Sequence, residues 1–158
     1  MSDEVLAVVQ PSTARRGLGI GTLGLLGVML IYVALMSPPA EIAWQVFLLV
    51  VGVVTVWFAE RMRRATALGL ELTREGLRTS EGEIIAAMDD IENIDRSMFA
   101  FKPSNGFILR LKSGQGGRWM PGLWWQVGRR VGVGGVTSKN QTKAMAEIIA
   151  IIVAERKT

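Results

Sequence analysis

Arginine and tryptophan side chains gather in one short stretch of the chain, and the chemistry they offer is binding. The members are Arg118, Trp119, Trp124, Trp125, Arg129 and Arg130. Tryptophan favours a membrane interface, with its apolar body in the lipid and its N–H among the headgroups. A neighbouring arginine can hold a phosphate through two parallel hydrogen bonds or lie against an anionic leaflet. The cluster predicts a surface that docks to lipid headgroups or caps a partner subunit. The alternative is that the tryptophans close a β-core and leave the arginines exposed.

Most catalytic chemistry is excluded by composition. The 158 residues include neither cysteine nor histidine. This removes disulfides, thiolate nucleophiles, zinc sites with histidine, imidazole ligation of haem, and Ser-His-Asp catalysis. Asp, Glu, Lys and Ser remain as possible catalytic groups, but no pocket is marked by their pattern. We therefore expect a protein that is not an enzyme and that holds neither cofactor nor metal.

Charge is segregated along the second half of the chain. Six carboxylates without a base lie between residues 81 and 95, and seven bases without an acid lie between residues 96 and 130. This pattern predicts either one acidic and one basic face or solvated loops of either sign. An EF-hand starting at Asp89 fails, because Ile91 and Ile94 occupy positions that require a ligand and a glycine. The net charge of +4 is too small, without a recognition motif, to indicate nucleic-acid binding.

Two glycine patterns suggest nucleotide sites without completing them. The segment 128-GRRVGVGG-135 could cradle phosphate through its backbone amides. It lacks the G-x-x-x-x-G-K-[S/T] pattern, because Ser138-Lys139 stand in the reverse order. The G-x-G-x-x-G run at residues 19–24 lies inside an apolar segment with no βαβ unit around it. We read neither as a nucleotide site.

Two long apolar runs predict a pair of transmembrane helices. Residues 17–36 carry no charge, and residues 42–59 have only Gln45 and Thr55 as polar interruptions. At about 1.5 Å per residue, each run covers a hydrocarbon core of roughly 30 Å. Two prolines in the short connection stop a helix. The sequence therefore predicts an antiparallel transmembrane hairpin over residues 17–60.

The distribution of basic residues predicts the orientation of this hairpin. Arginines precede the first run and follow the second, whereas the connection contains Glu41 and no base. The positive-inside rule places both termini in the cytoplasm. Residues 1–16 are then a cytoplasmic tail and residues 61–158 a cytoplasmic domain. A cleaved signal peptide is the alternative, but the first run is longer than a usual signal.

Glycines in the first run predict a helix-packing strip. At 100° per residue Gly17, Gly21 and Gly24 share one face, with Gly27 beside them. Small residues let another helix approach closely. The partner is either Gly52 of the second run or a helix of another protein.

Short alternating segments follow the hairpin and predict strands. Residues 68–73 and 77–79 read as a strand pair around a turn, and residues 98–102 and 107–111 as another pair around an Asn-Gly turn. Residues 83–94 fit a short helix or a strand–helix junction. The pair Pro121-Gly122 predicts a further turn.

A helix closes the chain. Ser138 is a candidate N-cap, and residues 143–156 carry an apolar stripe at i, i+3, i+4 spacing. The stripe consists of Met145, Ile148, Ile149, Ile152 and Val153. We expect it to pack against the preceding antiparallel sheet.

In this order of elements the chain resembles the membrane-anchored pleckstrin-homology-like (PH-like) proteins of bacteria, which place a two-span hairpin before a small β-domain closed by a C-terminal helix. The matching stretches are 72-LTREGL-77, like the family's first hairpin, and residues 88–95, like its following strand. The tract 119-WMPGLWW-125 belongs to no general pattern of that family. The resemblance implies a binding module with no catalytic residues.

The sequence thus predicts a transmembrane α-helical hairpin joined to a small α+β domain, with an antiparallel PH-like sheet closed by an amphipathic helix. We expect a multi-pass protein of the bacterial inner membrane. Its expected work is docking of the domain to lipid headgroups, anionic ones included, or to a membrane partner. The alternative is an accessory or assembly subunit of a larger membrane complex, for example a bioenergetic one, held through the hairpin. Self-association is a further possibility for the glycine strip.

Overall fold

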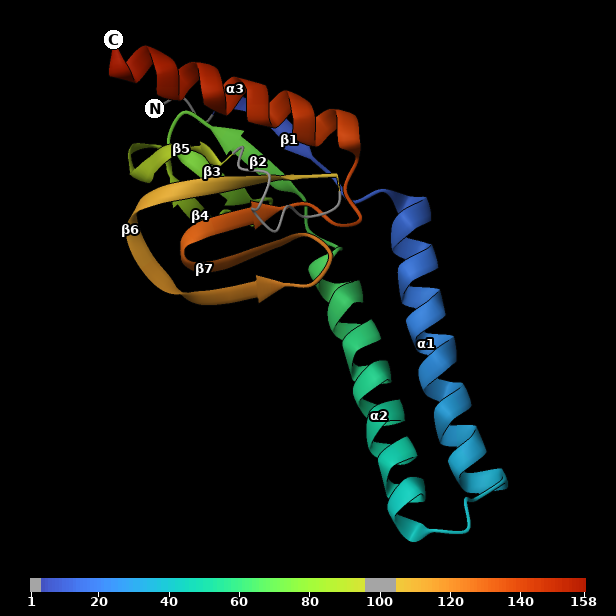
Figure 1. Ribbon diagram of the computed structural model, residues 1–158. Coiled ribbons are helices and arrows are strands. Elements are labelled where there is room, and N and C mark those ends of the chain that lie inside the picture. Colours follow the sequence, from blue (N-terminus) through green and yellow to red (C-terminus); the bar gives the residue numbers. More distant parts are fainter. Residues whose placement is uncertain (1–3, 96–104) are drawn as a thin grey trace. The chain divides into compact units, whose positions relative to one another are not determined.

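The chain forms two compact units in a computed structural model that describes residues 4–95 and 105–158. One unit is the helical hairpin, Thr13–Arg64, and the other joins the residues before it to the residues after it. The second unit is a small α+β domain of two antiparallel sheets and a C-terminal helix (Figure 1).

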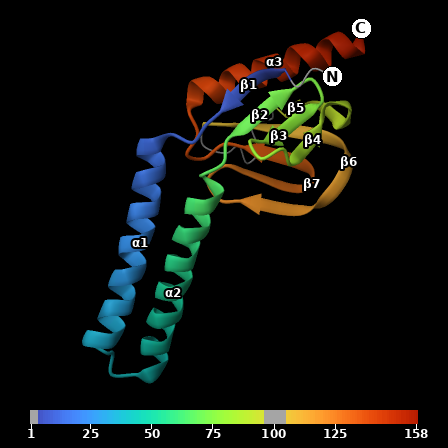
Figure 2. The same ribbon diagram turned by 180° about the vertical axis from the view of Figure 1, so that it is seen from behind.

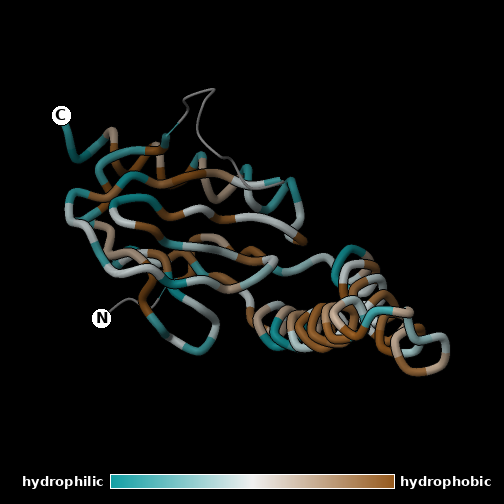
Figure 3. The backbone as a smooth tube through the Cα atoms, turned by 60° about the horizontal axis from the view of Figure 1, so that its bottom comes forward, coloured by the Kyte–Doolittle hydropathy of each residue, from teal (hydrophilic) through white to brown (hydrophobic). Residues whose placement is uncertain are grey.

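The hairpin consists of α1 (Thr13–Met36) and α2 (Ile42–Ala65). Both helices are 24 residues long and apolar enough to cross a membrane. Figure 3 shows that apolar residues dominate both of them. Large apolar side chains on their surfaces are exposed, among them Leu18, Leu25 and Trp44 at 75%, 64% and 58%. Soluble proteins rarely expose so continuous an apolar surface.

The first sheet begins before the hairpin. Its strands, in spatial order, are β1 (Val5–Val9), β2 (Leu70–Thr73), β3 (Gly76–Thr79) and β4 (Ile84–Ala87). The chain leaves this sheet at Val9 and returns at Leu70, which are opposite each other in the β1–β2 pairing. The whole hairpin is therefore an insertion between two neighbouring strands.

The second sheet has three strands in the order β5 (Ile91–Asp95), β6 (Phe107–Met120) and β7 (Trp124–Val133). A single 3₁₀ turn, η1 (Met88–Asp90), connects it to β4. The ambiguous segment 83–94 is thus strand, turn and strand rather than a helix. Its isoleucines divide between the two sheets, and Ile85 and Ile91 are both buried.

The C-terminal helix α3 (Lys139–Lys157) lies across the two sheets, as the opposed views in Figures 1 and 2 agree. It contacts β1, β5 and β6. The predicted stripe is the buried face, since Met145, Ile149 and Val153 are at most 5% exposed and the other two members pack on the core. At the far end, Arg156 donates hydrogen bonds to the carbonyl oxygens of Met88 and Ile91. Ser138 is the N-cap residue but makes no side-chain cap.

One sequence expectation changes in the structure, that for the N-terminal residues. Residues 1–16 are not simply a tail, because β1 pairs with β2 and Pro11 bridges to Thr137. The turn in 72-LTREGL-77 joins β2 and β3, the second and third strands of the sheet. The strand expected at residues 98–102 lies outside the described residues. The strand expected at residues 107–111 is the start of β6.

Candidate binding surface

The predicted Trp/Arg cluster lies on one long hairpin, β6–β7. Pro121 and Gly122 form its turn, in which the Leu123 N–H donates to the Met120 carbonyl oxygen at 3.1 Å. Gly122 has a φ of 80°, a value that favours glycine at the third position of a type II turn. The turn prediction is therefore confirmed.

This hairpin is bent, and the bend decides which side chains meet. The β6–β7 pairing shifts register on both sides of the Gln115–Gly128 pair. Beyond the turn, the Gly134 N–H donates to the Leu123 carbonyl oxygen at 2.9 Å. The end of β7 therefore returns beside its own beginning. Figure 1 shows the ribbon of β6 and β7 curling in this way.

Trp124 belongs to the interior of the domain, and Arg118 lies against its ring. Trp124 is 2% exposed and is part of the main core. The Arg118 guanidinium carbon lies 5.2 Å from the centre of the Trp124 ring. For Trp124 the alternative, that tryptophan closes the β-core, describes the structure.

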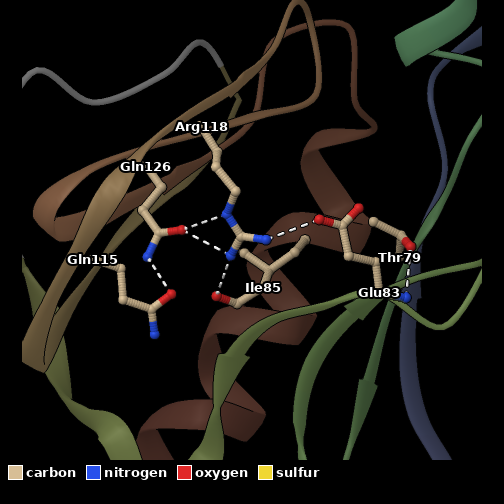
Figure 4. Close-up of polar contacts among 6 residues, drawn as sticks. All are labelled: Thr79, Glu83, Ile85, Gln115, Arg118 and Gln126. Carbon is tan, nitrogen blue, oxygen red and sulfur yellow. Dashed lines mark hydrogen bonds and ion pairs between the residues drawn. The ribbon is translucent and has the colours of Figure 1, made fainter.

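Arg118 ties the distal end of the hairpin to β4, as Figure 4 shows. It donates to the Gln126 side-chain oxygen at 3.1 and 2.9 Å and to the Ile85 carbonyl oxygen at 3.3 Å. It also pairs with Glu83 at 2.8 Å. Gln126 is fully buried and donates in turn to Gln115 at 3.3 Å. Arg118 therefore satisfies buried acceptors and is not available to a ligand.

Trp119 and Trp125 occupy the opposite face of the same hairpin. They are directly opposite each other in the β6–β7 pairing, so their side chains point to the same side. Trp119 is 50% exposed, and nearby Val127 is 65% exposed. The Trp125 ring covers Gly132, where a Cβ would lie 2.3 Å from the ring. This face, defined by Trp119, Trp125 and Val127, is called the outer aromatic face below.

Arg129 and Arg130 remain accessible at the bend of β7. Their side chains are 51% and 54% exposed. Arg129 donates to the Leu111 carbonyl oxygen at 3.0 Å and lies 3.6 Å from Glu92. Of the six predicted cluster residues, the structure leaves Trp119, Arg129 and Arg130 exposed and Trp125 half-buried.

Of the two alternatives for the segregated charges, separate acidic and basic faces do not form among the described residues. Carboxylates of the acidic block pair with bases from the following segment and from α3. These ion pairs are Glu83–Arg118, Glu92–Arg110, Glu92–Arg129, Asp95–Arg130 and Asp89–Arg156. The two blocks are adjacent in the sequence, so antiparallel pairing of β5, β6 and β7 brings them together across the sheet. The residue that the sequence reading overlooked is Arg110, whose position opposite Arg130 follows only from the register.

The glycine-rich segment 128–135 is mostly strand and not a phosphate loop. Residues up to Val133 belong to β7, and Gly135 packs against the Gly122 backbone. No group of three or more metal-ligating side chains occurs among residues 4–95 and 105–158.

The glycine strip of α1 is divided by the structure. A Cβ on Gly27 would lie 2.6 Å from Val56 and 2.9 Å from the Gly52 carbonyl oxygen, so these glycines allow the two helices to meet. A Cβ on Gly17, Gly21 or Gly24 would find nothing within 4 Å. The predicted partnership of Gly52 therefore concerns Gly27 alone, and the other three glycines face away from α2.

A leucine at Gly27 should destabilise the hairpin, whereas a leucine at Gly24 should not. The first substitution forces a branched side chain into the contact with Gly52, which overpacking data suggest costs about 1–3 kcal/mol. The second enters open space on the same helix and is the matched control. Unfolding of the full-length protein by sodium dodecyl sulfate, followed by helical circular dichroism, measures both. Equal midpoints for the two variants would contradict the packing described here.

Comparison of the chain with protein-family models, with curated protein sequences and with solved structures finds no match. The geometry of the outer aromatic face, together with Arg129 and Arg130, is therefore the basis for a functional proposal.

Proposed function

We propose that this protein is a non-catalytic, membrane-anchored binding module. Its hairpin spans the bacterial inner membrane, and its α+β domain, of PH-like type, docks to lipid headgroups or to a membrane partner from the cytoplasmic side. The observation that carries the proposal is the exposure of Trp119, Arg129 and Arg130 on one strand pair, β6–β7, of a domain into which an apolar helical hairpin is inserted. Trp119 lies on the outer aromatic face and contributes nothing to the main core.

The insertion of the hairpin supports a membrane location with both ends on one side. Because β1 and β2 pair, the chain must enter and leave the hairpin on the same side of any bilayer that the hairpin crosses. Arg15 and Arg16 in the first turn of α1, and three arginines at the end of α2, favour the cytoplasmic side. The arrangement of strands followed by a closing C-terminal helix supports the PH-like resemblance.

Docking to the bilayer predicts that lipid quenches the fluorescence of Trp119. The full-length protein, with Trp44, Trp57 and Trp125 changed to phenylalanine, is reconstituted in vesicles of phosphatidylglycerol with brominated acyl chains. Bromine quenches only indoles that reach the interface, so we expect clear quenching that Trp119→Phe abolishes. Trp124 provides the internal reference, because it is buried in the core. Quenching that is absent, or that survives Trp119→Phe, would count against docking through this face.

A second candidate is an accessory or assembly subunit held through the hairpin. The observation that favours it is the open face at Gly17, Gly21 and Gly24, which α2 leaves uncovered. Leucine at Gly21 and Gly24 would release a bound helix in that case. It would leave a lipid-docking module unaffected.

A further inference from the structure

Two arginines stand directly opposite each other in the second sheet. Arg110 of β6 and Arg130 of β7 are register partners, and their side chains are 51% and 54% exposed. Opposed residues of an antiparallel pair have Cβ atoms about 4.5–5.5 Å apart on one face, and like charges there are destabilising. Arg129 adds a third guanidinium at the same end of the strand pair. An anion between them would remove this repulsion.

The neighbouring carboxylates neutralise these arginines only in part. Glu92 Oε2 lies 3.7 Å from Arg110 Nε and 3.6 Å from Arg129 Nη2, so one oxygen is shared by two guanidiniums. Asp95 Oδ2 lies 4.0 Å from Arg130 Nε. A charge-assisted hydrogen bond is about 2.7–2.9 Å long, so none of these ion pairs is one. Three guanidiniums thus face two carboxylates. None of these ion pairs is a short, charge-assisted hydrogen bond, so the guanidiniums can still donate such bonds to an anion.

We propose that Arg110, Arg129 and Arg130 form a binding site for a phosphate-type oxyanion. The planar forks of Arg110 and Arg130 each match two oxygens of a tetrahedral phosphate, and the spacing of the strand pair lets both reach one anion. Gly132 follows Arg130 by two residues on the same face, and the Trp125 ring above it forms an apolar wall. The proposed site is therefore a group of three arginines bordered by the outer aromatic face.

This inference deepens the proposed function and rests on it only for the source of the phosphate. The source that we favour is the headgroup of an anionic lipid, because an interfacial tryptophan lies on the same hairpin. Free phosphate has the same chemistry, so the two sources need separate measurements.

The test of the site is a thermal titration of the full-length protein in uncharged detergent. Inorganic phosphate replaces chloride at constant ionic strength, and near-ultraviolet circular dichroism follows unfolding. We expect Tm to rise with phosphate and the apparent affinity to fall about tenfold or more in Arg110→Gln/Arg130→Gln. The matched control, Arg74→Gln/Lys143→Gln, removes the same charge elsewhere and should respond like the unmodified protein. Because phosphate also stabilises proteins by exclusion from their surface, only the difference between the two variants is informative.

Two further results decide the interpretation. If Arg110→Gln/Arg130→Gln does not fold, Arg110→Lys/Arg130→Lys is measured in its place. The lysine variant keeps the charge but loses the forked geometry of arginine, so it too should bind phosphate more weakly than the unmodified protein. A phosphate response that is equal in the site variant and the control overturns the proposal.

A second arm identifies the source. In bilayer nanodiscs, a difference in Tm between unmodified protein and Arg110→Gln/Arg130→Gln that is larger in phosphatidylglycerol than in phosphatidylcholine assigns the site to lipid. An equal difference, with a retained response to soluble phosphate, assigns it to a free anion. Either result can occur whether or not lipid quenches Trp119, so failure of the proposed function and failure of this site are distinguishable.

Discussion

Removal of residues 4–12 should abolish cooperative unfolding of the α+β domain. These residues include β1, which pairs with β2 and contacts α3. Val9 is fully buried, the Ser12 N–H donates to the Val136 carbonyl oxygen at 2.6 Å, and the Gln10 N–H donates to Gln141 at 2.9 Å. Each backbone hydrogen bond contributes about 1 kcal/mol and a buried valine about 1.5–3 kcal/mol. Their combined loss is comparable to the total stability of a small domain, about 5–15 kcal/mol.

Thermal unfolding of the truncated protein, followed in detergent by near-ultraviolet circular dichroism, measures this effect. The signal reports Trp124 in the core and should lose its sharp transition. Val5→Thr/Val8→Thr is the matched control, because both side chains are about 40% exposed on the same strand and the change should cost little. A truncated protein that unfolds as sharply and at the same temperature as the full chain would show that β1 is not part of the domain.

Replacement of Arg118 by methionine should destabilise the domain by about 2–4 kcal/mol. The change leaves the Gln126 side-chain oxygen and the Ile85 carbonyl oxygen without their donor, and it uncovers Trp124. Unmet buried acceptors cost about 1–3 kcal/mol each. The Arg118 side chain is 35% exposed, so its ion pair with Glu83 adds little. Chemical denaturation of the full-length protein gives the difference in the free energy of unfolding.

A double variant separates this network from a simple loss of charge. In Arg118→Met/Gln126→Leu an apolar side chain replaces each of the two polar partners. A large part of the stability lost in Arg118→Met should therefore return. Arg74→Met removes an arginine whose ion pair is exposed and 3.8 Å long, and it should change stability by less than about 1 kcal/mol. An Arg118→Met variant as stable as Arg74→Met would show that Arg118 is a surface residue.

The sequence predicts the helical hairpin more completely than the α+β domain. Length and hydropathy were sufficient for the two apolar helices, and i, i+4 spacing was sufficient for the buried stripe of α3, because both are local patterns. The part played by β1 could not be found in this way. Val5–Val9 is a short apolar segment, and its partner β2 lies beyond the whole hairpin.

The candidate surface shows the same limit more sharply. Six arginine and tryptophan residues were grouped because they are close in the sequence. Alternation along β7 sends Trp124 inward and Trp125 outward, and the register shift at Gln115 changes which residues face each other. The ion pairs between the acidic and basic segments also depend on this register, as does the opposition of Arg110 and Arg130. Composition supplied the candidates, but pairing decided which of them remain exposed.

The most direct test of a membrane-docking module is mass spectrometry of the full-length protein, extracted with a tag in mild detergent. We expect the protein alone with retained anionic lipid, and less retained lipid after Trp119, Arg129 and Arg130 are replaced together by serine, glutamine and glutamine. The contradicting result is a stoichiometric membrane-protein complex without bound anionic lipid. If those substitutions leave this complex unchanged and leucine at Gly21 and Gly24 disrupts it, the result contradicts lipid docking and establishes the accessory-subunit function.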